Sequence, residues 1–223
     1  MAYKPAPGIN PLTQAYYYTD FVEHYGNTWT TVVGGSASLT DTQSGTPAGH
    51  PGVVQLQVSG AFASSGMGLA MQIALGGGSI INQHIVQIPV LGSATNRINL
   101  QFGLMDSVGG FTNTQPQNGC YFQYQDNQNS GKWQCITTSG GVSTTSDSGV
   151  TTNTNYNNFK IAVDAAGTNV YFYINETLVA TNTTNLPSSL LMGGIALSCS
   201  SADTSNNVLY DMFYFLKNLS TSR

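Results

Sequence analysis

The sequence predicts an all-β protein: an antiparallel β-sandwich preceded by an extended N-terminal arm. Apolar residues recur in short runs in which every second residue is apolar, which is the period of a strand with one buried face. Clusters of Gly, Asn, Ser and Thr separate these runs, as turns do. Apart from one turn near Pro187–Leu191, no segment repeats its apolar residues at the period of a helix.

Residues 1–18 are expected to form the arm, and residues 19–223 a single domain. Three prolines fix φ and remove backbone donors, so the segment favours extended backbone. Three consecutive tyrosines then either anchor the arm, on its own domain or on a neighbouring subunit, or begin the first strand. The candidate assembly residues are Pro5, Pro7, Pro11, Tyr16, Tyr17 and Tyr18.

Two early runs have one apolar face and one amide face. In 53–60 the apolar residues are Val54, Leu56 and Val58, opposite Gln55 and Gln57. In 97–106 they are Ile98, Leu100, Phe102 and Leu104, and Asn99 and Gln101 are expected to face outward. Each run therefore predicts a strand with one side in the core.

Two hairpins follow. Residues 118–138 predict two strands joined by a polar loop around Asp126–Gly131. Residues 158–182 predict a strand that turns at Asp164–Thr168, a second strand, and a tight turn at Asn175-Glu176, where a positive φ favours Asn. The runs 193–200 and 208–216 complete roughly ten to thirteen strands with no break in composition, which predicts one domain.

Charged residues are scarce, at 7% of the chain against about 25% in an ordinary soluble domain. Six Lys plus Arg face ten Asp plus Glu, and there is no basic run, which argues against nucleic acid as a partner. No apolar stretch approaches the roughly 20 residues of a membrane span. The N-terminus lacks the apolar segment of a signal peptide, so we expect synthesis in a cytoplasm without secretion.

The three cysteines, Cys120, Cys135 and Cys199, form no metal-ligand spacing. An odd number without a signal peptide favours free thiols, with a Cys120–Cys135 bridge as the alternative.

The stretches YFQYQDNQNSGKWQCITTSGGVSTTSDSGV and NYNNFKIAVDAAGTNVYFYINETLVATNTTNLPSS resemble concanavalin A-like (laminin-G-like) jelly-roll domains of the type found in bacteriophage virion structural and tail proteins. The resemblance extends over about residues 20–217 and is most specific over 118–190. The chain departs from the family pattern at Glu176, where Gly is common. The resemblance implies a jelly-roll fold, and this fold serves hydrolases, lyases, lectins and passive virion parts alike.

The residues needed for catalysis on such a fold are not evident. A glycosidase needs two carboxylates across the scissile bond. The chain has only two glutamates, Glu23 and Glu176, and neither has a carboxylate two residues away. Gln83-His84-Ile85 is similar to the Gln-(Ile/Val)-His strand of alginate lyases in a different order, and the arginine-rich partner strand is missing. We therefore expect no catalytic residues and no enzyme activity.

The sequence contains the aromatic rings and side-chain amides that a glycan-binding site uses. The candidate glycan-binding residues are Tyr121, Trp133, Tyr171 and Tyr173, taken as the outward alternates of their strands. The alternative is that these rings cover a second sheet or a subunit interface. We expect no cofactor and no metal site, although Asp126 or Asp147 could hold calcium at a sandwich edge.

These observations lead to one expected function and two alternatives. We expect a non-enzymatic virion subunit, a capsid decoration (cement) or related surface protein, located in the virion and contacting major capsid or tail proteins. The alternatives are a tail-associated module that recognises host surface glycan, and, less favoured, a glycan hydrolase or lyase. We also expect a closed homo-oligomer, with a trimer foremost.

Overall fold

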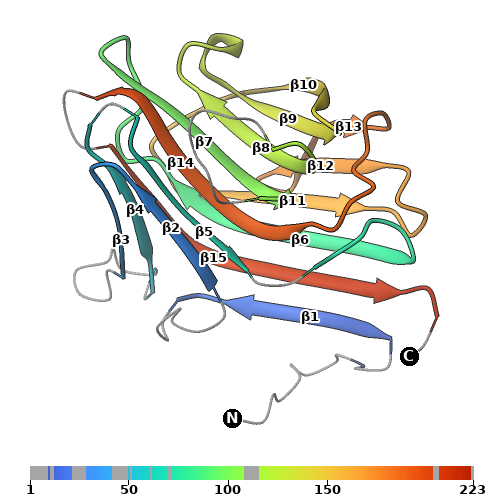
Figure 1. The fold of residues 1–223 in the computed structure, drawn as a ribbon. Helices are drawn as coiled ribbons and strands as arrows, with labels where there is room; N and C mark the ends of the chain where they lie inside the picture. The colour runs from blue at the N-terminus through green and yellow to red at the C-terminus, as the bar shows by residue number, and fades with distance from the viewer. Residues whose placement is uncertain are drawn as a thin grey trace.

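The computed structural model describes residues 10, 13–21, 29–41, 50, 52–60, 62–69, 72–107, 116–202 and 206–221, which form two antiparallel sheets packed face to face (Figure 1). The strands are β1 (Gln14–Thr19), β2 (Trp29–Gly34), β3 (Ala37–Asp41), β4 (Val54–Val58), β5 (Ser64–Leu69), β6 (Gly78–Gln87), β7 (Asn96–Met105), β8 (Gly119–Gln125), β9 (Lys132–Ser139), β10 (Val142–Thr151), β11 (Asn157–Val163), β12 (Val170–Ile174), β13 (Thr177–Asn182), β14 (Met192–Ala202) and β15 (Asn206–Leu219). One short 3-10 turn, η1 (Asn129–Gly131), joins β8 to β9. The predicted all-β sandwich is confirmed.

We call the two sheets sheet A and sheet B. Sheet A runs in the order β13-β12-β11-β6-β15-β4-β3, and β1 also pairs with β15. Sheet B runs in the order β10-β9-β8-β7-β14-β5-β2, and β7 and β14 bend visibly along their length in Figure 1. Consecutive strands pair in β11-β12-β13 and in β7-β8-β9-β10, whereas the centre of each sheet joins distant parts of the chain, as where β15 lies beside β6 and β14 beside β7.

The predicted alternation of buried and exposed residues is confirmed in the strands where it was clearest. In β4, Val54, Leu56 and Val58 are buried, and their two glutamine neighbours are half-buried. In β7, the even-numbered residues from Ile98 to Leu104 belong to the core between the sheets. Asn99 and Gln101 therefore point to the opposite side of sheet B.

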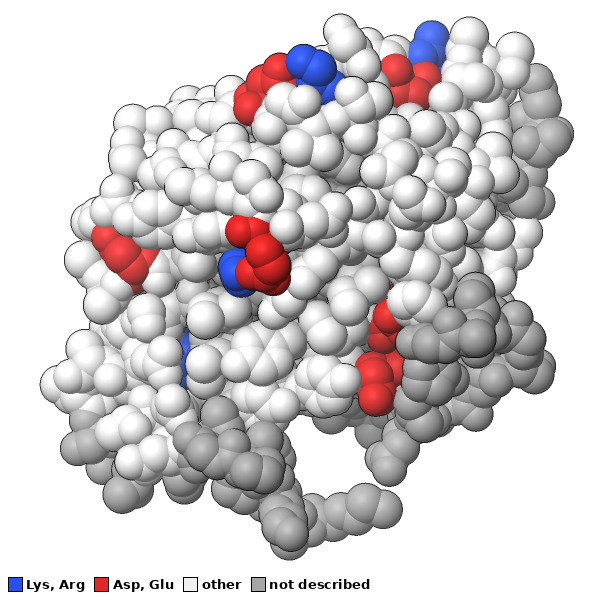
Figure 2. All heavy atoms as spheres, turned by 180° about the vertical axis from the view of Figure 1, so that it is seen from behind, with Lys and Arg blue, Asp and Glu red and all other residues white. Residues whose placement is uncertain are grey.

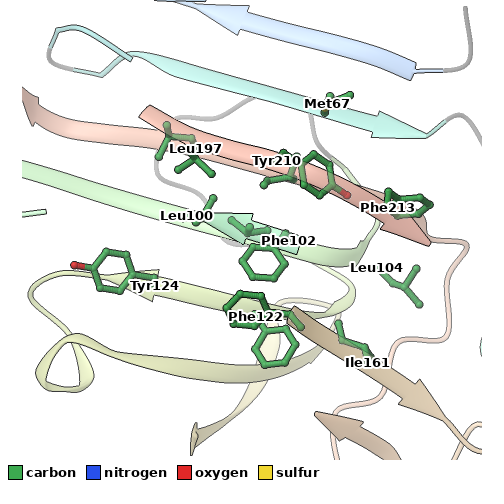
Figure 3. Packing of buried hydrophobic residues seen from close by; sticks show 14 of the residues in the cluster. Met67, Leu100, Phe102, Leu104, Phe122, Tyr124, Ile161, Leu197, Tyr210 and Phe213 are labelled. Atoms are coloured by element: carbon green, nitrogen blue, oxygen red, sulfur yellow. The ribbon is translucent and has the colours of Figure 1, made fainter. Parts of the chain in front are cut away.

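Aromatic rings fill the centre of the sandwich (Figure 3). The ring of Phe102 lies 4.8 Å from that of Phe159 and 5.7 Å from that of Phe122, measured between centroids. Trp133 packs edge-on against Phe159 at 4.6 Å. These contacts join strands of sheet B to β11 of sheet A, so the rings hold the two layers together.

A buried histidine lies in the same core. His84 Nδ1 lies 2.8 Å from the Tyr210 hydroxyl, and Nε2 lies 2.7 Å from Asn82 Oδ1. The Asn82 amide nitrogen donates to the Tyr214 carbonyl, which fixes Oδ1 toward the imidazole. His84 Nε2 therefore carries the proton, and Nδ1 accepts from the tyrosine. Burial lowers the pKa of His84 to about 3, so the ring is neutral and serves the core.

The three consecutive tyrosines lie in β1, on the protein's own sheet. Tyr17 points toward the core, where its ring lies 5.9 Å from Phe213 and its hydroxyl accepts from Trp29 Nε1 at 3.2 Å. Tyr16 and Tyr18 point to the other side of sheet A. Of the two alternatives left by the sequence, the three tyrosines form the first strand. Pro5, Pro7 and Pro11 lie outside the residues that the structure describes.

The predicted turn between β12 and β13 has the expected backbone. Asn175 and Glu176 both have positive φ, at 48° and 64°. Two left-handed residues in a row make the two-residue turn whose twist matches a hairpin. The Glu176 carboxylate pairs with Lys160 on β11. Glutamate thus occupies a position at which glycine would be less strained.

All three cysteines are free and buried. Cys120 and Cys135 lie on neighbouring strands but out of register, since Cys120 is opposite Thr137. In the part of the chain that the structure describes, no helix is long and apolar enough to cross a membrane.

Candidate functional site: the amide row of sheet B

The side of sheet B that faces away from sheet A carries a row of side-chain amides. Asn99 and Gln101 lie on β7, and register places Gln101 opposite Gln123 on β8. Gln123 is in turn opposite Gln134 on β9. We call these four residues the amide row. They come together because each occupies an outward position on adjacent, in-register strands.

Although it faces away from the core, the amide row is largely removed from water. Asn99, Gln101 and Gln123 are 6%, 3% and 1% exposed. Gln123 Nε2 donates to Asn99 Oδ1 at 2.8 Å. Gln101 Nε2 and Gln134 Oε1 are buried with no hydrogen-bond partner. A buried donor or acceptor left unpaired costs about 1–3 kcal/mol, so the row holds unused hydrogen-bonding capacity.

Tyr121 lies beside the amide row on the same side of β8. It packs with Met105 and Ile136 in a small apolar cluster separate from the main core. Burial, with the nearby Asp106 carboxylate adding to it, raises the pKa of Tyr121. The phenol therefore stays neutral and can donate or accept a hydrogen bond. Asp106 Oδ1 is another buried oxygen without a partner.

Small residues continue this face beyond β7. Across β7 and β14, Gln101 lies opposite Ala196, and Gly103 lies opposite Gly194. Gly103 has φ of +144°, and a Cβ there would meet the Cys120 carbonyl oxygen at 2.6 Å. It would also meet Ile161 of the core, so only glycine fits at this position of β7.

The structure separates the four residues predicted to bind glycan. Trp133 is 2% exposed and packs between the sheets, so the expectation that its ring faces outward is wrong. Its strand buries Trp133 and Cys135 on one side and turns Gln134 to the other. Tyr121 does lie on an outward face, although it is fully buried there. Tyr171 and Tyr173 are half-buried on the outward face of sheet A, whereas Tyr121 lies on sheet B.

The amide row was only partly visible in the sequence. The alternation of 97–106 placed Asn99 and Gln101 outward, but an outward amide is ordinary on a solvated strand. Gln123 and Gln134 gave the same weak signal, since their alternation also puts them opposite core residues. What makes the set a site is the register of β7, β8 and β9, and register is a tertiary property.

Both carboxylates considered for calcium already have hydrogen-bonding partners in the protein. Asp126 pairs with Arg97 and accepts from the Ile98 backbone N–H. Asp147 accepts from the Gly149 N–H, then from the Asn129 amide and Lys132, and these bonds lower its pKa. Among the described residues, no group of three His, Cys, Asp or Glu side chains could hold a metal ion.

A second polar cluster lies at a bulge in β15. His50 Nδ1 is 2.6 Å from Asp211 Oδ2, and the His50 ring stacks on Tyr156 with centroids 3.8 Å apart. Burial raises the pKa of Asp211, the hydrogen bond and charge of His50 lower it, and the nearby Asp20 raises it. The fold thus brings Asp20 and Asp211 into electrostatic contact, which their separation in the sequence did not reveal.

Solved structures with the same fold come from several functional classes. The carbohydrate recognition domain of Emp47p is 12% identical, with a TM-score of 0.67, covering 95% of this chain and 100% of that chain. SO2946 from Shewanella oneidensis MR-1, a protein of unknown function, is 15% identical, with a TM-score of 0.66, covering 95% and 89%. The alginate lyase AlyC3 in complex with dimannuronate is 10% identical, with a TM-score of 0.55, covering 75% and 76%.

These likenesses show a concanavalin A-like jelly roll, a fold that lectins and glycan-processing enzymes share. No curated protein matches the chain. The family model described as "SO2946-like, C-terminal domain" matches residues 49–210, well over half of the chain. The chain therefore belongs to the SO2946-like C-terminal domain family.

Proposed function

We propose that this protein is a non-enzymatic glycan-binding protein and that the amide row with Tyr121 is its binding site. Sugar hydroxyls donate and accept hydrogen bonds, and one side-chain amide can both accept and donate them. Tyrosine adds an apolar ring and one hydroxyl. The carbohydrate recognition domain of Emp47p, which has the same fold, supports this choice of ligand class.

One observation carries the proposal: Gln101 is 3% exposed, lies on the outward side of the sheet, and has an amide nitrogen without a partner. A residue kept only for stability would not leave a buried donor unused, because an apolar residue of the same shape would be more stable there. A ligand hydroxyl that accepts from Gln101 Nε2 removes this cost. Binding sites commonly retain such locally unfavourable groups.

The ligand is expected to be uncharged. No Lys or Arg is among the amide row, Tyr121 or the small residues beside them, so an anionic sugar would lack a counter-charge. Asp106 beside Tyr121 disfavours anions further. An uncharged oligosaccharide held by amides should bind with little dependence on salt, since screening acts on charges.

The test is a glycan array with the full chain, followed by titration of the best ligand against Gln101→Leu and Gln123→Leu. Each substitution should weaken binding at least tenfold. Gln55→Leu is the matched control, because Gln55 is an outward, half-buried glutamine on β4 of sheet A and should leave affinity unchanged. Equal loss in all three variants, or no glycan bound, would contradict the proposal.

For a hydrolytic role, the candidate catalytic pair is the carboxylates Asp20 and Asp211. Asp211 is 7% exposed, and its raised pKa is a property of catalytic acids. An assay for released reducing ends with the wild-type chain addresses this directly. Turnover that disappears in Asp211→Asn would replace the non-enzymatic proposal with a hydrolase.

The virion role expected from the sequence stays a prediction. It is supported by the resemblance to bacteriophage domains and by the scarcity of charged residues, which are few on the face shown in Figure 2. A glycan-binding virion subunit would use the same amide row to attach to a host surface. Detection of the chain in purified particles by mass spectrometry would support the virion role, and its absence from them would count against it.

A further inference from the structure

The outward face of sheet A differs from the amide row in its chemistry. Register aligns one outward residue from each of six adjacent strands in a single row across the sheet. From β13 to β1 this row is Leu178, Tyr173, Lys160, Gln83, Tyr214 and Tyr18. The next row, from β12 to β1, is Tyr171, Ala162, Ile81, Leu216 and Tyr16. We call these two rows the tyrosine face.

In the second row of the tyrosine face two tyrosines flank aliphatic side chains, and the middle of the first row holds Lys160 and Gln83. Its residues are half-buried or exposed; Leu178 is 50% exposed and Tyr18 is 45% exposed, at opposite ends of one row. No described element packs over them, and in Figure 1 the strands of sheet A form an outer layer. Five tyrosines and several aliphatic residues with a single charged side chain, Lys160, form a composition typical of a protein interface.

Three of the rings are already held in place. Lys160 Nζ lies 4.6 Å from the centroid of the Tyr173 ring and also pairs with Glu176. Tyr16 meets Tyr214 edge-on at 5.5 Å between centroids. Rings fixed before association lose little conformational freedom when a partner covers them, which favours binding.

We propose that the tyrosine face joins two copies of this chain in a homodimer. The two sheets would stack about a twofold axis that runs parallel to the strands between β11 and β6. This axis exchanges β12 with β15 and β13 with β1. Tyr173 of one copy then faces Tyr214 of the second, and Tyr171 faces Leu216. In the centre of the first row Lys160 faces Gln83 of the second copy, and the tyrosines and aliphatic residues of the second row face one another, as a twofold interface allows.

The charge and the size of the face both fit a second copy. Identical charged faces repel each other, but the cation of Lys160 is balanced within its own chain by Glu176. Together with the outward row on each side of it, which contains Ile85 and Met212 at one end and Ser79 and Asn218 at the other, the tyrosine face spans about 29 Å by 20 Å, or roughly 600 Å² in projection before side-chain relief is counted. A standard interface buries about 800 Å² per partner, and this area approaches that value once the relief of the side chains is added.

The test is sedimentation velocity of the full chain over a range of concentrations. The wild type should dimerise, and Ile81→Arg, which sets two like charges near the axis, should weaken the dimer at least tenfold. Val142→Arg is the control: Val142 is 62% exposed on β10, at the edge of sheet B, and should leave the dimer intact. A monomer at all concentrations, or a dimer insensitive to Ile81→Arg, would overturn the proposal.

Cross-linking tests the axis itself. All native cysteines are buried, so an introduced cysteine is the accessible thiol. A short bismaleimide should join Tyr173→Cys chains to Tyr214→Cys chains, because facing sheets lie about 10 Å apart. Either variant alone should not cross-link, since the axis separates equivalent positions by roughly 17 Å. Cross-linking of one variant alone would overturn this arrangement.

A glycan on the tyrosine face is the competing occupant. A chain that stays monomeric and loses glycan affinity on Tyr173→Ala would overturn the dimer and assign the face to sugar. The dimer does not depend on the proposed glycan site. Loss of glycan binding in Gln101→Leu with the dimer unchanged, and loss of the dimer in Ile81→Arg with glycan binding unchanged, are the separate results that we expect.

Discussion

Gln101 and Gln123 lie directly opposite each other on β7 and β8, on the side of sheet B that faces away from the core. Both are nonetheless buried, at 3% and 1% exposure, and Gln101 Nε2 has no hydrogen-bond partner. Two amides in this position do not serve the apolar core, and they are not solvated. This combination singles out the outward face of sheet B for recognition of a polar, uncharged ligand.

The neutral core histidine should make the protein sensitive to acid. The pKa of His84 is about 3 in the folded chain against 6.5 in the unfolded chain, because burial disfavours the charged ring. The contribution of neutral His84 to the free energy of unfolding is therefore complete above pH 6.5 and is lost as the pH falls toward 3. The difference of about 3.5 units between these two pKa values lowers the free energy of unfolding by about 5 kcal/mol at the low end of this window.

Urea unfolding between pH 7 and pH 3 measures this dependence. In the wild type, the free energy of unfolding should fall with pH through the window. His84→Gln should be less stable at pH 7, because it disturbs the bonds to Tyr210 and Asn82, but should show a flatter dependence on pH. The same slope in both proteins would show that other groups cause the acid sensitivity.

Trp133 should matter for stability and not selectively for binding. Its ring is 2% exposed and contacts Phe102, Phe159 and Tyr124. Trp133→Ala should lower the free energy of unfolding by about 3–5 kcal/mol, as for other large buried rings. Tyr171→Ala, on a half-buried position of β12, should cost much less. A stable Trp133→Ala protein that has lost only glycan affinity would restore the role expected from the sequence.

The turn at Glu176 should tolerate glycine. Glu176 has φ of 64°, a conformation that costs a non-glycine residue about 1–2 kcal/mol. The exposed pair with Lys160 contributes only about 0.5 kcal/mol, so Glu176→Gly should raise stability by roughly 1 kcal/mol. Glu176→Gln keeps the backbone strain and removes the ion pair, so it should lower stability slightly. Chemical denaturation of both variants separates the two effects, and a less stable Glu176→Gly would contradict this account.

Much of the fold could be predicted from local pattern. Alternation identified the strands around Val54–Val58 and Ile98–Leu104 with their inward faces, because one buried face imposes a period of two. The turn at Asn175-Glu176 followed from its residue types. The prediction that Trp133 faces outward was wrong because its ring was interpreted as a ligand contact. The alternation of Trp133, Gln134 and Cys135 places Trp133 on the same side of the strand as a buried cysteine.

The sites could not be predicted, because each depends on contacts between distant segments. The amide row needs β7, β8 and β9 in one register, and the tyrosine face needs six strands that span nearly the whole chain. Asp20 and Asp211 are almost two hundred positions apart, and only the closed sheet brings them together. Alternation gives each strand its faces but not its neighbours.

Gln101→Leu tests the central claim most directly, with the free energy of unfolding and glycan affinity measured on the same preparation. Leucine has a similar shape and removes the unpaired buried amide, so we predict a chain that is about 1 kcal/mol more stable and binds glycan at least tenfold more weakly. Higher stability with lost binding would show that Gln101 is kept for a ligand. A destabilised variant, or one with unchanged affinity, would contradict the account.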